Sequence, residues 1–148
     1  MLKIVSRIYR FIRYNNEKKL SLYCWFYAAK YRIQMLYSDT KKLQKKWGEA
    51  GKESPDDATL EEYQYAKKIA YCVNEVCGKT SWESKCLVRA LSAQSLLKKK
   101  GIQTTLYLGC KEQDGKMVAH AWLRLGRFYV TGGNGSADGY GVVAKFLA

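Results

Sequence analysis

The hydrophobic period changes near Gly101, and this change limits the fold more than any other feature of the sequence. Before Gly101, apolar residues recur three or four positions apart, which is the spacing of one face of a helix. After Gly101, apolar and polar residues alternate in short segments separated by glycines, which predicts strands joined by turns. Helices followed by a mainly antiparallel sheet indicate an α+β fold class.

The predicted elements follow in chain order. We expect helices over residues 1–13, 18–37 and 60–76, and a fourth from about Ser84 to the lysines at 98–100. We expect strands over residues 104–109, 118–125, 128–131 and 141–146, with hairpin turns at 114–115 and 126–127. Thr59 and Glu62 have the spacing of a capping box for the third helix. The second helix is rich in aromatic residues, and we expect it to be covered on more than one side.

The length of the chain indicates one domain. With 148 residues and 47% hydrophobic residues, it can bury one core but is short for two. We therefore expect a single domain over residues 1–148, with a helical N-terminal portion (1–58) and a core (59–148). Within the N-terminal portion, residues 38–58 are polar and are expected to form a connection or a short irregular helix.

Charge and cysteine content point to a compartment and to a partner. Residues 1–50 hold twelve Lys and Arg against three acids, within a formal net charge of +13, so the partner of this half is expected to be acidic. No apolar stretch approaches the roughly 20 residues that span a bilayer, and basic residues interrupt any signal-peptide core. Five irregularly spaced cysteines suit a reducing compartment. We expect a cytoplasmic protein.

Two residues have the chemistry of a cysteine nucleophile and its base. Cys86 stands at the start of the predicted fourth helix, where free N–H groups and the helix dipole favour a thiolate and can stabilise an oxyanion. His120 is the only histidine and begins a strand segment, and imidazole is suited to accept a thiol proton near neutral pH. A structural cysteine and a passive histidine are the ordinary alternatives.

The sequence around these residues resembles a known family. The motifs are residues 81–91 (SWESKCLVRAL), 101–102 (GI), 105–109 (TLYLG) and 120–123 (HAWL). Together they closely resemble the transglutaminase-like leader peptidases of lasso peptide biosynthesis, over about residues 66–146. The resemblance implies a transglutaminase- or papain-like core in residues 59–148. It also implies that Cys86 and His120 form a catalytic pair in a cysteine protease.

The resemblance also implies a substrate and partners. Members of this family remove the leader from a ribosomally made precursor peptide, before a separate cyclase closes the core peptide. Leader capture is expected to depend mainly on a separate recognition protein, for which the basic N-terminal half is a docking face. The thiolate mechanism requires no cofactor.

The third member of the triad is harder to assign. The family places an aspartate on the strand after the histidine, and counting along the hairpin puts Thr131 at that position. Asn134 and Asp138 follow shortly and are alternatives for orienting His120. Trp82 and Trp122 flank the catalytic pair in sequence and are candidates for the walls of the substrate cleft, with plain core packing as the alternative.

Three other functions are compatible with the composition. A zinc site would draw its ligands from four cysteines and the histidine: Cys72, Cys77, Cys86, Cys110 and His120. Their spacings match no usual zinc pattern. Nucleic-acid binding would use the positive charge, but no recognition motif is present, and we expect no nucleic acid. Contact of residues 1–13, an amphipathic basic segment, with a membrane surface is the third alternative.

Overall fold

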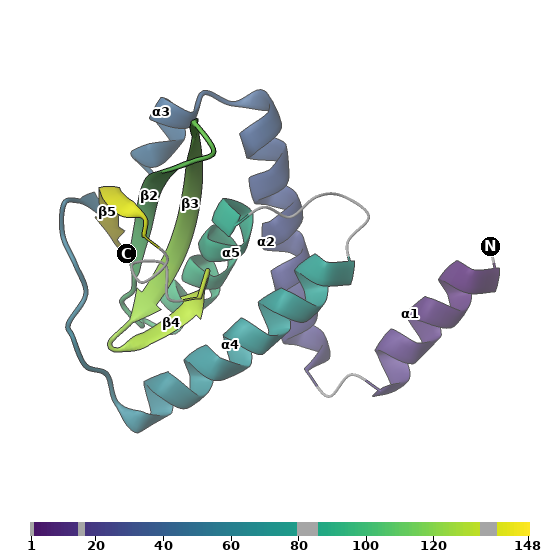
Figure 1. Cartoon of the computed structure of the whole chain (residues 1–148). Coiled ribbons are helices and arrows are strands. Elements are labelled where there is room, and N and C mark those ends of the chain that lie inside the picture. Colours follow the sequence, from purple (N-terminus) through teal and green to yellow (C-terminus); the bar gives the residue numbers. More distant parts are fainter. Residues whose placement is uncertain (1, 15–16, 80–85, 134–138) are drawn as a thin grey trace.

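The computed structural model describes residues 2–14, 17–79, 86–133 and 139–148, and it confirms the α+β class. Helices come first and strands follow (Figure 1). The elements are α1 (Leu2–Tyr14), α2 (Lys18–Tyr37), α3 (Thr40–Gln44), β1 (Glu49–Ala50), α4 (Leu60–Lys79), α5 (Cys86–Lys98), β2 (Thr105–Gln113), β3 (Lys116–Leu125), β4 (Phe128–Thr131) and β5 (Gly141–Leu147). The predicted helices and strands are confirmed, and the connection after α2 proves to hold α3 and β1.

Local sequence signals account for two of these boundaries. The capping box before α4 is formed: the Glu62 N–H donates to Thr59 Oγ1 at 3.2 Å, and the Thr59 N–H donates to Glu62 Oε2 at 2.8 Å. The turn between β2 and β3 has positive φ at Asp114 (53°) and Gly115 (73°), as expected for the turns that match strand twist. Both signals act within a few residues of chain.

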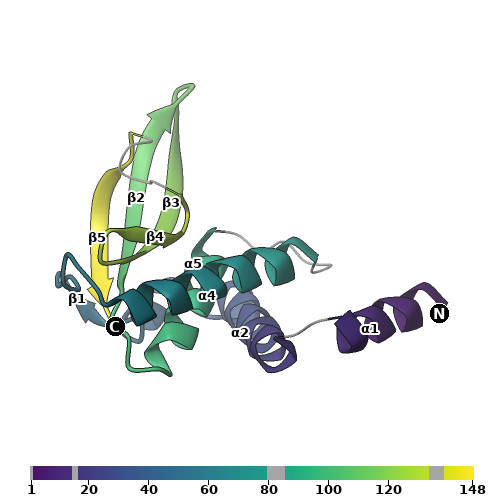
Figure 2. The same cartoon turned by 90° about the horizontal axis from the view of Figure 1, so that it is seen from below.

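The five strands that the structure describes form one antiparallel sheet in the order β1-β5-β2-β3-β4. The C-terminal strand β5 therefore lies between the short β1 and the long β2–β3 hairpin. This hairpin projects beyond the helices (Figure 2). At the other edge, β4 pairs with β3 only at Leu123–Leu125, so the hairpin continues past the end of β4.

Side chains alternate between two faces of the sheet. The face that we call closed packs against α4 and α5, and its residues belong to the hydrophobic core: Leu106, Leu123, Leu125 and Phe146. The face that we call open points away from these helices and bears Tyr107, His120, Trp122 and Arg124. Residues 51–57 cross part of the open face, where the Ser54 N–H donates to Thr105 Oγ1 at 2.7 Å.

The exposure of α2 differs from the prediction made from its sequence. On one side of α2, Cys24 and Ala28 are fully buried against α4 and α5. On the other side, large apolar side chains remain exposed, so the prediction that α2 is covered on more than one side is wrong. This exposed stripe consists of Leu22, Phe26, Ile33 and Leu36. Among the helices that the structure describes, none is long and apolar enough to cross a bilayer.

Candidate active site

Cys86 is the first residue of α5, as its proposed role requires. Its side chain is partly exposed, and α5 packs against β3 and β4. The first turn of a helix presents N–H groups without partners inside the helix, and these groups favour negative charge nearby. The predicted cap Ser84 and the predicted cleft residue Trp82 lie outside the described residues.

The imidazole of His120 is held on the open face by three neighbours. Its ring stacks against Trp122 at a centroid distance of 5.8 Å and tilts against Tyr140 at 5.1 Å. Its Nε2 atom lies 2.9 Å from the carbonyl oxygen of Gly132. Because a carbonyl only accepts hydrogen bonds, Nε2 must carry a proton in this contact, which leaves the lone pair of the neutral ring on Nδ1. Nδ1 is therefore the nitrogen available to accept a proton.

Gly132 supplies this carbonyl, and the sequence reasoning did not single it out for a contact with His120. Its φ is +78°, which side-chain-bearing residues rarely adopt. A Cβ atom at this position would lie 2.6 Å from Trp122 Cβ and 2.8 Å from the Ala121 carbonyl oxygen. The residue after β4 must therefore be glycine if the chain is to pass so close to Trp122. The Gly132-Gly133 pair after a buried strand was the signal available in the sequence.

Thr131, the predicted third member of the triad, makes no such contact. Its side chain is buried, and its Oγ1 has no hydrogen-bond partner among the described residues. It pairs in register with Leu123, which belongs to the closed face. In this structure the Gly132 carbonyl, and not the Thr131 hydroxyl, contacts the imidazole. The alternatives Asn134 and Asp138 lie outside the described residues.

The elements that carry the two proposed catalytic groups belong to different sides of the sheet. Helix α5 packs on the closed face, whereas His120 shares the open face with Trp122. Among the residues that the structure describes, no hydrogen bond joins the Cys86 thiol to the imidazole. However, the part of β3 that precedes Leu123, which includes His120, does not pair with β4, so this edge of β3 is unpaired beside His120 among the described residues.

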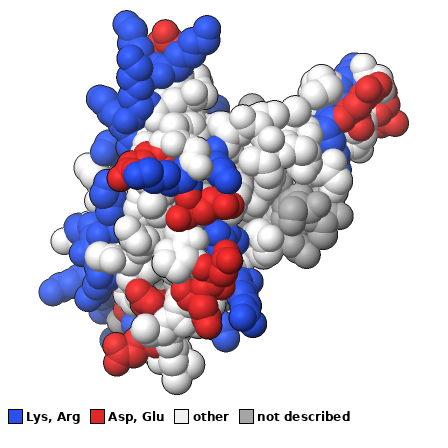
Figure 3. Space-filling model, turned by 90° about the vertical axis from the view of Figure 1, so that its left-hand side faces the viewer, with Lys and Arg blue, Asp and Glu red and all other residues white. Residues whose placement is uncertain are grey.

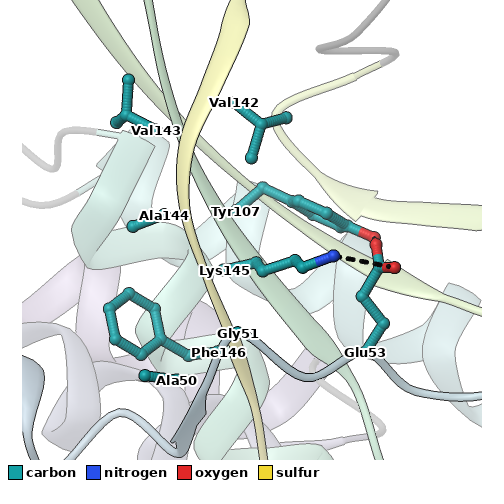
Figure 4. A pocket seen from close by; sticks show the side chains of 9 residues that line it. All are labelled: Ala50, Gly51, Glu53, Tyr107, Val142, Val143, Ala144, Lys145 and Phe146. Carbon is teal, nitrogen blue, oxygen red and sulfur yellow. Dashed lines mark hydrogen bonds and ion pairs between the residues drawn. The ribbon is translucent and has the colours of Figure 1, made fainter.

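Two hollows beside β5 offer space for a substrate. The β5 side of the molecule carries charges of both signs, with acidic side chains in the middle of the view (Figure 3). A hollow of about 620 Å³ surrounds β5 and is lined by apolar residues such as Val142, Val143 and Phe146 (Figure 4). A second hollow of about 300 Å³ has Trp122 and Arg124 in its wall. Trp122 thus lies between His120 and a cavity.

A small polar network separates these two hollows. Both are lined by Glu53 and Tyr107, and the Tyr107 hydroxyl donates a hydrogen bond to the Glu53 carboxylate. This hydrogen bond is the main cause that holds the pKa of Glu53 below its ordinary value, and Lys145 Nζ, at 3.2 Å, adds to the effect. Burial is the main cause that raises the pKa of Tyr107. The network fixes the aromatic ring against which Trp122 stacks, at 5.5 Å.

The cysteines proposed as zinc ligands do not form a metal site. Cys72 and Cys77 lie on α4 beside Cys24 of α2, and the Cys72 sulfur is 3.6 Å from Ser21 Oγ. The Cys24 thiol is the main cause that lowers the pKa of Cys72 to about 7. Among the described residues, no group of three or more His, Cys, Asp or Glu side chains could hold a metal ion.

Fold and site define a class of protein in which a cysteine starts a helix and a histidine lies on a neighbouring antiparallel sheet. Residues 28–145 match the model of the transglutaminase-like superfamily, and the chain belongs to that superfamily. The match begins within α2, so the family domain includes part of the helical N-terminal portion. Comparisons with curated proteins and with solved structures found no match.

Proposed function

We propose that the protein is a cysteine peptidase in which Cys86 is the nucleophile and His120 is the base. The observation that supports this proposal most directly is the contact between His120 Nε2 and the Gly132 carbonyl, because it leaves Nδ1 as the basic nitrogen. Membership of the transglutaminase-like superfamily, whose members include cysteine proteases and acyltransferases, supports the pairing with a helix-start cysteine.

The chemistry proceeds through an acyl-enzyme. The Cys86 thiol gives its proton to His120 Nδ1, and the sulfur attacks the carbonyl carbon of the scissile peptide bond. The N–H groups at the start of α5 stabilise the oxyanion. The carbon–nitrogen bond breaks as His120 protonates the leaving amine, which leaves a thioester. Water then attacks the thioester, gives a proton to His120 and releases a carboxylic acid and the free thiol.

The substrate we propose is the leader segment of a lasso peptide precursor, captured by a separate recognition protein. The resemblance of residues 81–91 and 120–123 to leader peptidases supports this substrate, and the basic N-terminal half fits an acidic leader or partner. Acyl transfer to an amine is the second candidate, because the superfamily includes acyltransferases and the same thioester can be attacked by an amine in place of water.

Mass spectrometry of a cleavage reaction tests the proposal. The wild-type protein would be incubated with the proposed precursor peptide and the proposed recognition protein. The Cys86→Ala variant would be treated in the same way in parallel. Cleavage with gain of one water by wild type, and no cleavage by the variant, is expected. Cys110→Ala is the matched control, because Cys110 is also partly exposed. Unchanged cleavage by Cys86→Ala would remove the mechanism, and a product carrying an added amine would identify acyl transfer.

A further inference from the structure

The two N-terminal helices carry most of the uncovered apolar surface. Eleven of the sixteen large hydrophobic side chains that the described residues leave exposed belong to α1 or α2. Helix α1 stands apart from the rest of the molecule in both views (Figures 1 and 2). Exposed apolar surface on this scale marks a binding surface rather than ordinary scatter.

Helix α1 has the pattern of a helix that lies at an interface. Its apolar face remains uncovered where it is described, with Ile4 62% and Val5 60% exposed. The charged residues of its polar face are all basic: Lys3, Arg7, Arg10 and Arg13 fall on the side away from the centre of the apolar face. A helix of this kind buries its apolar face at the boundary between headgroups and acyl chains, while its cations meet the headgroups.

Helix α2 repeats this pattern on its outer side. The exposed stripe of Leu22, Phe26, Ile33 and Leu36 recurs at the spacing of a single helix face, opposite the buried Cys24 and Ala28. Lys30 and Arg32 are placed on either side of this stripe, about 80° from its centre at 100° per residue. Long basic side chains beside an apolar stripe can extend toward headgroups while their methylene chains cover apolar surface.

The charge of this region selects the kind of partner. Residues 1–38 contain eight Lys and Arg and a single acid, Glu17, which pairs with Lys68 at 2.6 Å. Helices α1 and α2 themselves contain no Asp or Glu. A surface that is apolar and free of negative charge is suited to an anionic partner.

We propose that α1 and the outer stripe of α2 together bind the surface of an anionic lipid bilayer. Both helices present convex apolar faces, and a bilayer can receive such faces without a matching groove, whereas a protein partner would have to supply one. The strong positive charge opposes pairing of this face with a second copy. The inference does not depend on the chemistry proposed for Cys86 and His120.

Vesicle sedimentation of the full chain tests this inference. The probes are vesicles of phosphatidylcholine mixed with phosphatidylglycerol, and vesicles of phosphatidylcholine alone. Wild type is expected to pellet with the mixed vesicles only. Val5→Glu on α1 and Ile33→Glu on α2 are each expected to weaken binding by at least about tenfold, because each places a carboxylate in the apolar contact. Val5 and Ile33 are exposed, so both variants should fold.

Met117→Glu is the matched control, because Met117 is 68% exposed on the β2–β3 hairpin. This variant is expected to bind like wild type. The inference is overturned if wild type does not pellet with the mixed vesicles, or if Ile33→Glu binds as wild type does. It is also overturned if sedimentation equilibrium without lipid shows a dimer that Ile33→Glu dissociates, since a second copy would then be the occupant.

Discussion

The two faces of the sheet differ in what they bury and in what they leave available. The closed face holds Leu106, Leu123 and Leu125 against α4 and α5 in a continuous apolar core. The open face carries His120 and Trp122, and Trp122 lies in the wall of a hollow beside a polar network. Apolar contacts hold the fold from one side, so the other side is free to keep polar groups in fixed positions. The difference indicates that substitutions on the closed face should mainly change the stability of the fold, and that substitutions on the open face should mainly change the proposed chemistry at His120.

The largest expected effect on stability comes from the closed face. Leu123→Ala removes a fully buried side chain and should lower the free energy of unfolding by ~2–5 kcal/mol. Val142→Ala on the open face removes a side chain that is half exposed and should cost only about 0.5 kcal/mol. Urea denaturation of the two variants checks this comparison. Equal losses of unfolding free energy would show that the open face contributes as much to stability as the closed face.

Gly132 offers a way to disturb the open face alone. In Gly132→Ala the new methyl group would collide with Trp122 and the Ala121 carbonyl, so the carbonyl that orients His120 must move. A displacement of about 1 Å at a catalytic group can cost about 10²-fold in rate, and we expect kcat/KM to fall by that order.

Gly133→Ala is the matched control for this experiment. Gly133 also has positive φ, +64°, but a Cβ there would meet nothing within 4 Å. This variant should lose stability through backbone strain and keep most of its activity. If the two variants lose activity equally, the effect comes from backbone strain and not from displacement of the carbonyl.

Much of the fold could be predicted because its signals are local. The capping box at Thr59 and the turn at Asp114-Gly115 each depend on contacts within a few residues, and both appear as expected. The exposure of α2 could not be predicted, because the number of aromatic residues does not tell which side of a helix meets a neighbour. Only the packing of α4 and α5 decides that.

The sequence indicated on which face of the sheet His120 lies, but not which group contacts its ring. His120 and Leu123 differ by an odd number of positions, so the strand period already placed the histidine opposite the apolar face. The group that contacts the imidazole is a backbone carbonyl, which every residue has. The prediction of Thr131 came instead from counting along the hairpin to the position where the family has an aspartate. The register between β3 and β4 turns Thr131 toward the core.

Thr131→Val measures whether that hydroxyl has any role. The substitution keeps the shape of the side chain and removes a buried hydroxyl without a described partner, so stability should stay the same or rise by up to about 1 kcal/mol. Activity should stay within about threefold of wild type, because the Gly132 carbonyl still orients the ring. A large drop in kcat with unchanged stability would restore Thr131 as the orienting group.

The smallest expected effect is the pH dependence carried by Glu53. Its pKa is lower in the folded protein than in the unfolded chain, so its carboxylate stabilises the fold above the ordinary pKa of 4.5. This contribution is lost as the pH falls through the folded value. The Glu53 side chain is 42% exposed, so solvent screens its interactions and the gain at neutral pH should be under about 1 kcal/mol. Thermal unfolding of wild type and Glu53→Gln should converge in acid; a difference independent of pH would contradict this account.

The most direct test of the catalytic pair is the alkylation rate of Cys86 by iodoacetamide at neutral pH, followed on its own peptide by mass spectrometry. If His120 takes the thiol proton, His120→Gln should slow Cys86 alkylation by about tenfold, while Cys110, the other partly exposed cysteine, keeps its rate. A Cys86 rate that is the same in both proteins would contradict the pairing on which the proposed chemistry depends.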